Sequence, residues 1–216
     1  MDNQVRCKTR VADHGEVFTA QREVNNMLDL VKQETIRIDS RFLEPACGSG
    51  NFLVEVLNRK LEVVKAKYKK SQVEYEKYLT ISISSIYGID ILEDNINECR
   101  QRLYDIFDTK YSSIYKKSCK DDVRDTIRFI LSKNIICGDA LTLTKVGSDE
   151  PIIFAEWSAV NNNMIKRRDY TLNELLRNST SGDIGLFSDL GEDAFIPTPV
   201  KEYPLIHFLK LGIQDD

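Results

Sequence analysis

The sequence predicts an α/β fold in which helices cover both faces of a mostly parallel, doubly wound sheet. Two observations lead to this prediction. Segments rich in β-branched and apolar residues alternate with longer segments whose apolar residues recur at helical spacing. The first strand also ends in a glycine-containing elbow, Gly48-Ser49-Gly50, which leads directly into a helix. Strands and helices that alternate in this way are typical of parallel sheets.

The expected elements follow one another from the N-terminus. A turn at ADHGE precedes an amphipathic helix whose apolar residues are Val24, Met27, Leu28 and Val31. Strands are expected at 41–46, 81–90, 134–141 and 151–157, and helices at 51–70, at 93–111 and from 121 onward.

The composition changes after about Asn161, where turn residues and three of the five prolines gather. The sequence therefore predicts two parts. A cofactor-binding domain is expected at 1–160, and an irregular extension at 161–216 is expected to suit the docking of a partner chain.

The bulk composition bounds the function. Of the 216 residues, 42% are hydrophobic and 30% are charged, which is typical of a globular protein. The net charge of −4 gives no strong overall electrostatic attraction to nucleic acid. Five scattered cysteines and two histidines predict neither disulfides nor a metal site. The sequence shows no membrane-length apolar run and no signal peptide, so a cytoplasmic protein is expected.

Three basic clusters stand out against this acidic background, at 65–70, 115–120 and 166–168. The first two are typical of solvated helix faces or loops. The third, which lies beside Tyr170, is better suited to contacting phosphates.

The elbow offers backbone N–H groups and the positive end of a helix dipole to a ligand. Three acids, Glu44, Asp90 and Asp139, follow the ends of the first three strands, so we expect them in one crevice at the carboxyl edge of the sheet. A carboxylate after the second strand can accept both hydroxyls of a ribose, and one after the third can meet an exocyclic amine.

The residues around the elbow predict which nucleoside is bound. Leu53 occupies the place of the third glycine in the dinucleotide fingerprint, and Glu44 would repel a pyrophosphate. A carboxylate suits a ligand with a positive amine, so S-adenosylmethionine is the predicted cofactor. A nicotinamide-dependent oxidoreductase is the weaker alternative.

With these motifs in view, the chain resembles the adenine-N6 DNA methyltransferases of restriction-modification systems. FLEPACGSGNFL resembles their first cofactor motif, YGIDILEDNI their ribose-binding strand end, NIICGDAL their adenine-binding strand end, and HGEVFTA the segment upstream. The resemblance covers roughly Gly15 to Leu141. It implies a Rossmann-like methyltransferase fold, S-adenosyl-L-methionine as cofactor and DNA as partner.

The resemblance also implies which residues bind the cofactor. The methionine part would meet the segment at Phe18 and Thr19 and the elbow region, and the nucleoside would meet the next two strand ends. The expected cofactor residues are Phe18, Thr19, Glu44, Cys47, Gly48, Gly50, Asp90, Ile91, Asp139 and Ala140.

Catalysis in this family uses an Asn- or Asp-Pro-Pro-aromatic tetrad at the end of the fourth strand, where it binds a flipped base. This sequence contains no Pro-Pro, and Glu156-Trp157 stands at the expected place. A Glu can accept from an amine and a Trp can stack on a base, so both are candidate catalytic residues. The alternative is that Trp157 packs in the core and Glu156 is a polar strand-end residue.

The family also needs about three further strands and a target-recognition domain after this point. The resemblance therefore implies the cofactor-binding half of such an enzyme, an incomplete version of the fold. A non-catalytic cofactor-binding subunit or remnant that needs a partner chain is the main alternative. An RNA or small-molecule methyltransferase is also left open, because the cofactor motifs do not identify the acceptor.

Overall fold

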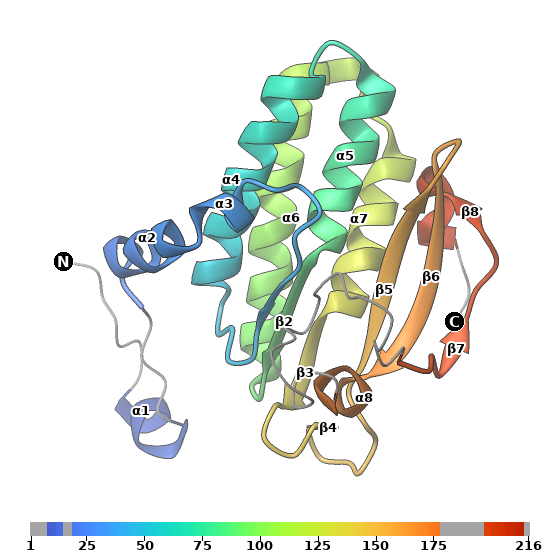
Figure 1. Cartoon of the computed structure of the whole chain (residues 1–216). Coiled ribbons are helices and arrows are strands. Elements are labelled where there is room, and N and C mark those ends of the chain that lie inside the picture. Colours follow the sequence, from blue (N-terminus) through green and yellow to red (C-terminus); the bar gives the residue numbers. More distant parts are fainter. Residues whose placement is uncertain (1–7, 15–18, 178–196, 214–216) are drawn as a thin grey trace.

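A computed structural model describes residues 8–14, 19–177 and 197–213 of the chain. A layer of long helices packs on a short parallel sheet, and a long β-hairpin stands beside them (Figure 1). Within the described ranges, no helix is both long and apolar enough to cross a membrane.

The first sheet has the order β1-β2-β3-β4. The strands β1 (Phe42–Glu44), β2 (Ile86–Asp90) and β3 (Ile135–Asp139) are parallel, and β4 (Thr144–Lys145) runs antiparallel at the edge. Glu44 pairs with Gly88, and Asp90 pairs with Cys137. The register therefore brings the carboxyl ends of the first three strands to one edge, as the sequence predicts.

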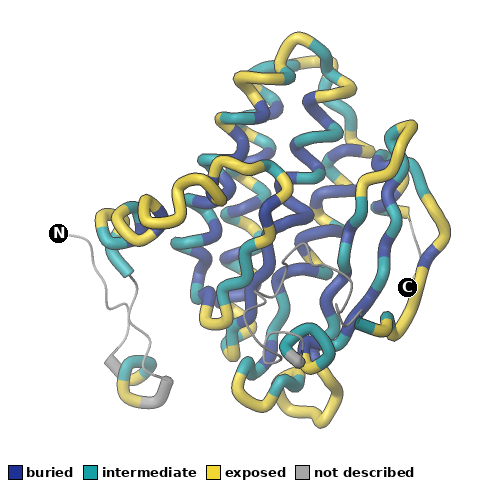
Figure 2. Tube along the Cα trace, viewed as in Figure 1, coloured by how far each residue is buried: buried dark blue, intermediate teal, exposed yellow. Residues whose placement is uncertain are grey.

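Four helices cover one face of this sheet: α4 (Asn51–Tyr68), α5 (Gln72–Ser84), α6 (Glu93–Tyr115) and α7 (Asp121–Asn134). Their inward sides are buried and their outward sides are exposed (Figure 2). Apolar residues at helical spacing bury a stripe on each helix, and these stripes form the main core with Ile86 and Ile135.

Shorter elements complete the described chain. They are α1 (Lys8–His14), α2 (Gln21–Leu30), α3 (Lys32–Thr35), η1 (Lys116–Ser118), α8 (Leu172–Arg177), β7 (Lys201–Glu202), β8 (Ile206–His207) and η2 (Phe208–Ile213). The helix α2 is the amphipathic helix expected before the first strand, and it buries Val24 and Leu28.

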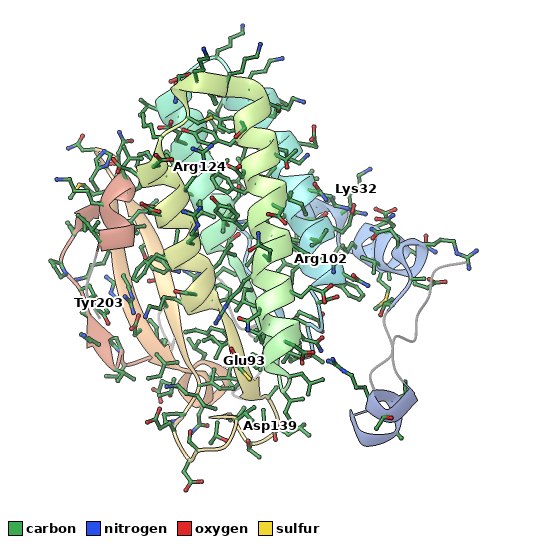
Figure 3. All side chains as sticks on the ribbon, turned by 180° about the vertical axis from the view of Figure 1, so that it is seen from behind. Lys32, Glu93, Arg102, Arg124, Asp139 and Tyr203 are labelled. Carbon is green, nitrogen blue, oxygen red and sulfur yellow. The ribbon has the colours of Figure 1, made fainter. Side chains whose placement is uncertain are left out.

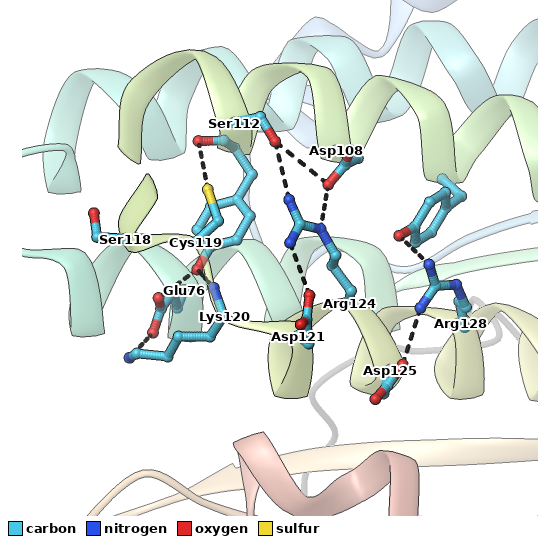
Figure 4. A network of polar contacts seen from close by, with 12 residues as sticks. Glu76, Asp108, Ser112, Ser118, Cys119, Lys120, Asp121, Arg124, Asp125 and Arg128 are labelled. Carbon is cyan, nitrogen blue, oxygen red and sulfur yellow. Dashed lines mark hydrogen bonds and ion pairs between the residues drawn. The ribbon is translucent and has the colours of Figure 1, made fainter. Parts of the chain in front are cut away.

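A network of polar contacts, drawn in Figure 4, holds α5, α6 and α7 together. The buried carboxylate of Glu76 accepts hydrogen bonds from the Tyr111 hydroxyl and the Lys120 ammonium, each at 2.6 Å. Arg124 pairs with Asp108 at 2.7 Å across the α6–α7 contact. A buried charge is tolerated only when it is paired in this way, so these contacts fix how the helices sit on one another.

The second strand is shorter than the sequence predicts. Residues 81–84 were expected in a strand at 81–90, but they form the last turn of α5. Leu79 and Ile83 are buried at helical spacing, and the hydroxyls of Ser82 and Ser84 donate to backbone carbonyls of the helix. Tertiary packing thus overrides the β preference of this isoleucine-rich segment.

The fourth strand does not join the parallel sheet. Instead, β5 (Ile153–Val160) pairs antiparallel with β6 (Met164–Thr171) along its whole length. Asn162 and Asn163, both at φ 61°, make the tight turn between them, as in hairpins whose turn residues take left-handed conformations. The hairpin straddles the expected boundary at residue 160.

The prediction of an irregular chain from 161 is wrong for residues 164–171, which form β6, while 178–196 lie outside the described residues. The alternation along β6 was hidden because its buried positions include the charged residues Arg167 and Asp169, which form an ion pair at 2.7 Å. In the sequence alone, charged residues such as these indicate positions that face solvent, so the buried side of the strand was not recognised.

The second face of the parallel sheet also differs from expectation. Tyr87 and Ile89 of β2 pack against Phe154 of β5 and Leu172 of α8, so a strand and a six-residue helix cover this face in the described part of the chain. The Tyr87 hydroxyl donates to the Ala155 carbonyl at 3.0 Å. Helices were expected on both faces of the sheet. In the structure, helices cover one face, and a smaller layer made of a strand and a short helix covers the other.

Candidate functional site at the carboxyl ends of the strands

The elbow after β1 depends on two glycines in the left-handed region, Gly48 at φ 51° and Gly50 at φ 89°. Side chains are disfavoured in this conformation. At Gly50 there is also no space, because an added Cβ would lie 2.6 Å from Sγ of Cys99 on α6. The elbow can therefore press against α6 only with glycine at this position.

A third glycine supports the elbow from β2. A Cβ on Gly88 would lie 2.9 Å from Cδ1 of Leu53 and 3.0 Å from Sγ of Cys47. The backbone N–H of Cys47 donates to the Ile89 carbonyl at 2.8 Å. The sequence analysis did not assign this role to Gly88, although its place in the YGID motif was a visible signal.

Asp90 connects the elbow to the start of α6. One carboxylate oxygen accepts from the Gly48 backbone N–H at 2.9 Å, and the other accepts from the Leu92 N–H at 2.9 Å and from the Asn95 side chain at 3.2 Å. The residue is half-buried at the end of β2. A carboxylate has about four acceptor positions, so Asp90 keeps capacity for a ligand hydroxyl while its orientation is fixed.

Arg102 holds the elbow from the α6 side, a role that the sequence did not indicate. Its guanidinium donates to the Ser49 carbonyl at 2.6 Å and to the Asn51 side-chain oxygen at 2.9 Å. An arginine in the middle of a helix carries no local sign of such a contact, since its partner lies 53 residues away. Figure 3 labels Arg102 on α6.

The upstream segment contacts the start of α4, directly after the elbow. The side-chain N–H of Asn51, the first residue of α4, donates to the Thr19 carbonyl at 3.1 Å. Phe18 lies outside the described residues. The structure thus brings Thr19 to the helix start that follows the two glycines.

Two ionisable residues beside the elbow are shifted toward their neutral forms. Burial raises the pKa of Glu44, and a hydrogen bond from the Ala46 backbone partly offsets this rise. The pKa of Cys47 is raised by its hydrogen bond with Cys99 and by burial. A thiol held neutral in this way packs against the elbow and is not an activated nucleophile.

The end of β3 contributes Asp139 to the same edge of the sheet. Its carboxylate accepts from the Leu141 backbone N–H at 2.8 Å, which orients the turn after the strand. Figure 3 shows Asp139 and Glu93 at the same end of the molecule. The acids that the sequence predicts to converge therefore occur at adjacent strand ends.

Apolar side chains stand in solvent beside these acids. Ile91 follows Asp90 and is 44% exposed, and Leu141 follows Ala140 and is 94% exposed. Exposed aliphatic groups next to oriented carboxylates offer both a flat contact and hydrogen-bond acceptors. This combination is typical of binding sites for small molecules that have an apolar ring and polar substituents.

The two candidate catalytic residues lie at the opposite end of the sheet. Glu156 accepts from Arg41 at 2.6 Å, and Arg41 directly precedes β1. The Trp157 indole N–H donates to the Asn134 side chain at 2.9 Å, and Asn134 directly precedes β3. The structure therefore groups both residues with the amino ends of the strands and does not bring them to the elbow.

The side chains of these two residues have partners within the fold. Trp157 is 8% exposed and packs edge-on against Phe129 of α7. Glu156 also accepts from the Ser158 hydroxyl at 2.7 Å and lies 3.5 Å from Arg168. Sequence spacing missed this position because β5 runs back toward the amino ends of the strands.

Comparison with known proteins locates the similarity over the elbow and the strand ends. The family described as MmeI, DNA-methyltransferase domain, matches residues 18–147. DNA methyltransferase A of Bacillus subtilis (strain 168) is 28% identical over 124 residues, which cover 53% of this chain and 14% of that protein. The chain thus spans only a small part of this relative. No solved structure gives a significant match.

Proposed function

Because the chain belongs to the family of the MmeI DNA-methyltransferase domain, a restriction-modification type of methyltransferase, we propose that it binds S-adenosylmethionine for methyl transfer to adenine N6 in DNA. The proposed site, called the crevice below, is the edge of the parallel sheet formed by the carboxyl ends of β1, β2 and β3. We place this reaction in the cytoplasm, where both the cofactor and DNA are available to the protein.

Each part of the cofactor has a proposed partner. Glu44 and the backbone of the Gly48–Gly50 elbow would hold the methionine part, since a carboxylate attracts its ammonium group. Asp90, with Ile91 beside it, would bind the ribose, and Asp139 and Ala140 would contact the adenine. When bound, S-adenosylmethionine supplies the methyl group, and these residues orient it.

The observation that carries the proposal is the double contact of Asp90. Its carboxylate is oriented by the elbow N–H of Gly48 and by Leu92 and Asn95 at the start of α6, and the residue is only partly buried. Ile91, which follows it directly, is exposed, so an oriented carboxylate and an apolar side chain occur together at the end of β2. A carboxylate at the end of the second strand is suited to accept a ribose hydroxyl.

A second candidate function, a cofactor-binding subunit that needs a partner chain, is favoured by the positions of Glu156 and Trp157. Neither side chain lies at the crevice, and both are engaged elsewhere. In that case the partner would supply the groups that bind the target adenine.

Cofactor binding is the first test. Calorimetry should detect S-adenosylmethionine binding to the whole chain, no binding of NADH, and a loss of affinity of about 10-fold or more in Asp90→Ala, because a ribose hydrogen bond to a charged acceptor is removed. Asp105→Ala is the matched control, since it removes an exposed carboxylate from α6. Unchanged affinity in a folded Asp90→Ala protein would overturn the cofactor assignment.

Methyl transfer separates the two candidate functions. The purified chain is incubated with labelled S-adenosylmethionine and unmodified genomic DNA, beside a competent adenine methyltransferase. Label on adenine supports an enzyme that acts alone. Cofactor binding without label supports the partner-dependent subunit, and label on another acceptor rejects the adenine assignment.

A further inference from the structure

A second recess lies between the two sheets, away from the elbow. It is a cavity of about 460 Å³ bounded by the end of α7, by β3 and by the β5–β6–β7 sheet. Tyr203, which follows β7, lines it. Figure 3 shows Tyr203 and Arg102 on opposite sides of the molecule, and none of the residues that line this recess, called the basic cleft below, is an expected cofactor residue.

The basic cleft concentrates positive charge in a chain whose net charge is −4. Its lining includes five cationic residues and a single carboxylate, that of Asp169. The cations come from five different elements, α6, α7, β4, β6 and β7, and they are Arg100, Lys133, Lys145, Arg167 and Lys201. A cleft lined by charges of one sign focuses the field and attracts ligands of the opposite sign.

The carboxylate of Asp169 is hydrogen-bonded to other residues that line the basic cleft. Asp169 forms two hydrogen bonds with Arg167, at 2.8 and 2.7 Å, and accepts a third from the Tyr203 hydroxyl at 3.1 Å. The Arg167 guanidinium also lies 4.0 Å from the centre of the Tyr203 ring. These buried contacts make a rigid wall, in which the charge of Asp169 is paired with that of Arg167.

The other cations stand on fixed elements around the opening. Arg100 is oriented by the Ile135 carbonyl at 2.9 Å, and the Lys201 ammonium lies 4.7 Å from the centre of the Tyr203 ring. Lys145 pairs with Glu150 on the outer side of the β4 turn and is otherwise exposed, as is Lys201. The charges therefore lie both inside the cleft and along its rim.

We propose that the basic cleft binds the phosphate groups of one nucleic-acid strand. Phosphates are the anions that arginine forks and lysine ammonium groups bind best, and a strand carries them at regular spacing. Cations on α6 and β4 on one side and on β7 on the other bracket a single backbone. The inference rests on the proposed function, because it takes the DNA of that reaction as the source of the phosphates.

The test compares two double variants that each remove two exposed lysines. Lys145→Ala/Lys201→Ala changes the cleft rim, and Lys69→Ala/Lys70→Ala changes the exposed end of α4. Fluorescence anisotropy follows binding of a short labelled single strand, and of the matching duplex, across a range of salt concentrations. S-adenosylmethionine affinity and thermal unfolding are measured on every variant.

We expect the cleft variant to bind the single strand roughly 10-fold more weakly at low salt. Its slope of log affinity against log salt should fall by about 0.7 for each phosphate contact removed. The α4 variant should bind within about twofold of the unchanged chain. Retained cofactor affinity and thermal stability in both variants would show that only strand binding is affected.

Three outcomes would overturn the inference. The unchanged chain could bind no oligonucleotide at low salt, both double variants could lose affinity equally, or inorganic phosphate could bind the cleft more tightly than the strand, which would make it a small-anion site. Each of these outcomes with intact S-adenosylmethionine binding leaves the proposed cofactor site standing. Loss of cofactor binding by the unchanged chain removes the proposed function separately.

Discussion

The two ends of the parallel sheet use polar residues in opposite ways. At the carboxyl end, Asp90 and Asp139 accept backbone hydrogen bonds and are still partly exposed. At the amino end, Lys60, Asn134 and Trp157 are buried, and each donates to a protein acceptor. The carboxyl end therefore has acceptor capacity left for a ligand, whereas these polar side chains at the amino end are hydrogen-bonded within the protein.

This difference shows that residue type alone does not mark a functional residue. A Glu followed by a Trp is chemically suited to binding a base, yet this pair lies where strands begin and contacts Arg41 and Asn134. In parallel sheets ligands gather at the carboxyl edge. Substitutions at the amino end should therefore change stability, and those at the carboxyl end should change cofactor binding.

The largest expected effect is at the amino end, in Trp157→Ala. This change empties a buried site beside Phe129 and leaves the Asn134 oxygen without its donor, so it should lower the free energy of unfolding by about 3–5 kcal/mol. Urea unfolding followed by circular dichroism measures the loss. S-adenosylmethionine affinity should stay within about twofold, and lost binding with unchanged stability would place Trp157 in the site.

Gly50→Ala tests the carboxyl end and should cost roughly 2–3 kcal/mol of unfolding free energy. The new Cβ meets Cys99 at 2.6 Å and also sits at φ 89°, a conformation that costs about 1 kcal/mol or more in a non-glycine residue. Cofactor affinity should fall as well, because the elbow moves away from α6.

Gly147→Ala is the matched control for that substitution. Gly147 is at φ 74°, and its added Cβ would meet nothing within 4 Å, so only the conformational cost remains. A second measurement, Gly50→Ala combined with Cys99→Ala, should recover part of the loss. Equal costs for the two single glycine variants would contradict a close elbow–α6 contact.

Lys60 gives a pH-dependent contrast at the amino end. Its ammonium is buried beside the carbonyls of Ile38 and Ser40 and the Ser85 hydroxyl, and desolvation lowers its pKa to about 7. Above pH 7 the folded chain releases this proton while the unfolded chain keeps it, so the free energy of unfolding rises with pH. Between pH 7 and 8.5 the rise should be about 1–2 kcal/mol.

Lys60→Met separates this rise from other titrations. The variant keeps a long side chain in the buried site but has no proton to release, so its stability should be flat over the same pH range. Urea midpoints in reducing buffer measure both proteins. A rise that persists in Lys60→Met would mean that another group titrates.

The sequence predicted the elbow and the acidic strand ends because both are encoded locally. The left-handed turn of Gly48 and Gly50 and the acid after β2 each need only a few neighbouring residues to be recognised. The assignment of these residues to the cofactor is still a prediction. Arg102 could not be found in this way, because its contact with Ser49 depends on how α6 packs.

The errors came from long-range pairing. The direction of β5 is set by its hairpin with β6, where Arg167 and Asp169 are buried as a pair, and by the Tyr87 hydrogen bond to Ala155, 68 residues away. The end of α5 was misread as strand because its isoleucines satisfy both patterns. Such choices are decided by packing partners that periodicity does not identify.

The smallest expected effect, and the sharpest test of the contrast between the ends, is Glu156→Gln. The variant keeps the shape of the side chain and loses the charge that faces Arg41, a partly exposed pair, so stability should fall by no more than about 1 kcal/mol. S-adenosylmethionine affinity should not change, because the carboxylate lies at the amino ends of the strands.

If the chain transfers methyl groups, a Glu156→Gln protein with normal cofactor affinity and stability but no transfer would show that Glu156 takes part in the reaction. Retained transfer would instead make the amino end purely structural and direct the search for the adenine-binding groups to the carboxyl edge or to a partner.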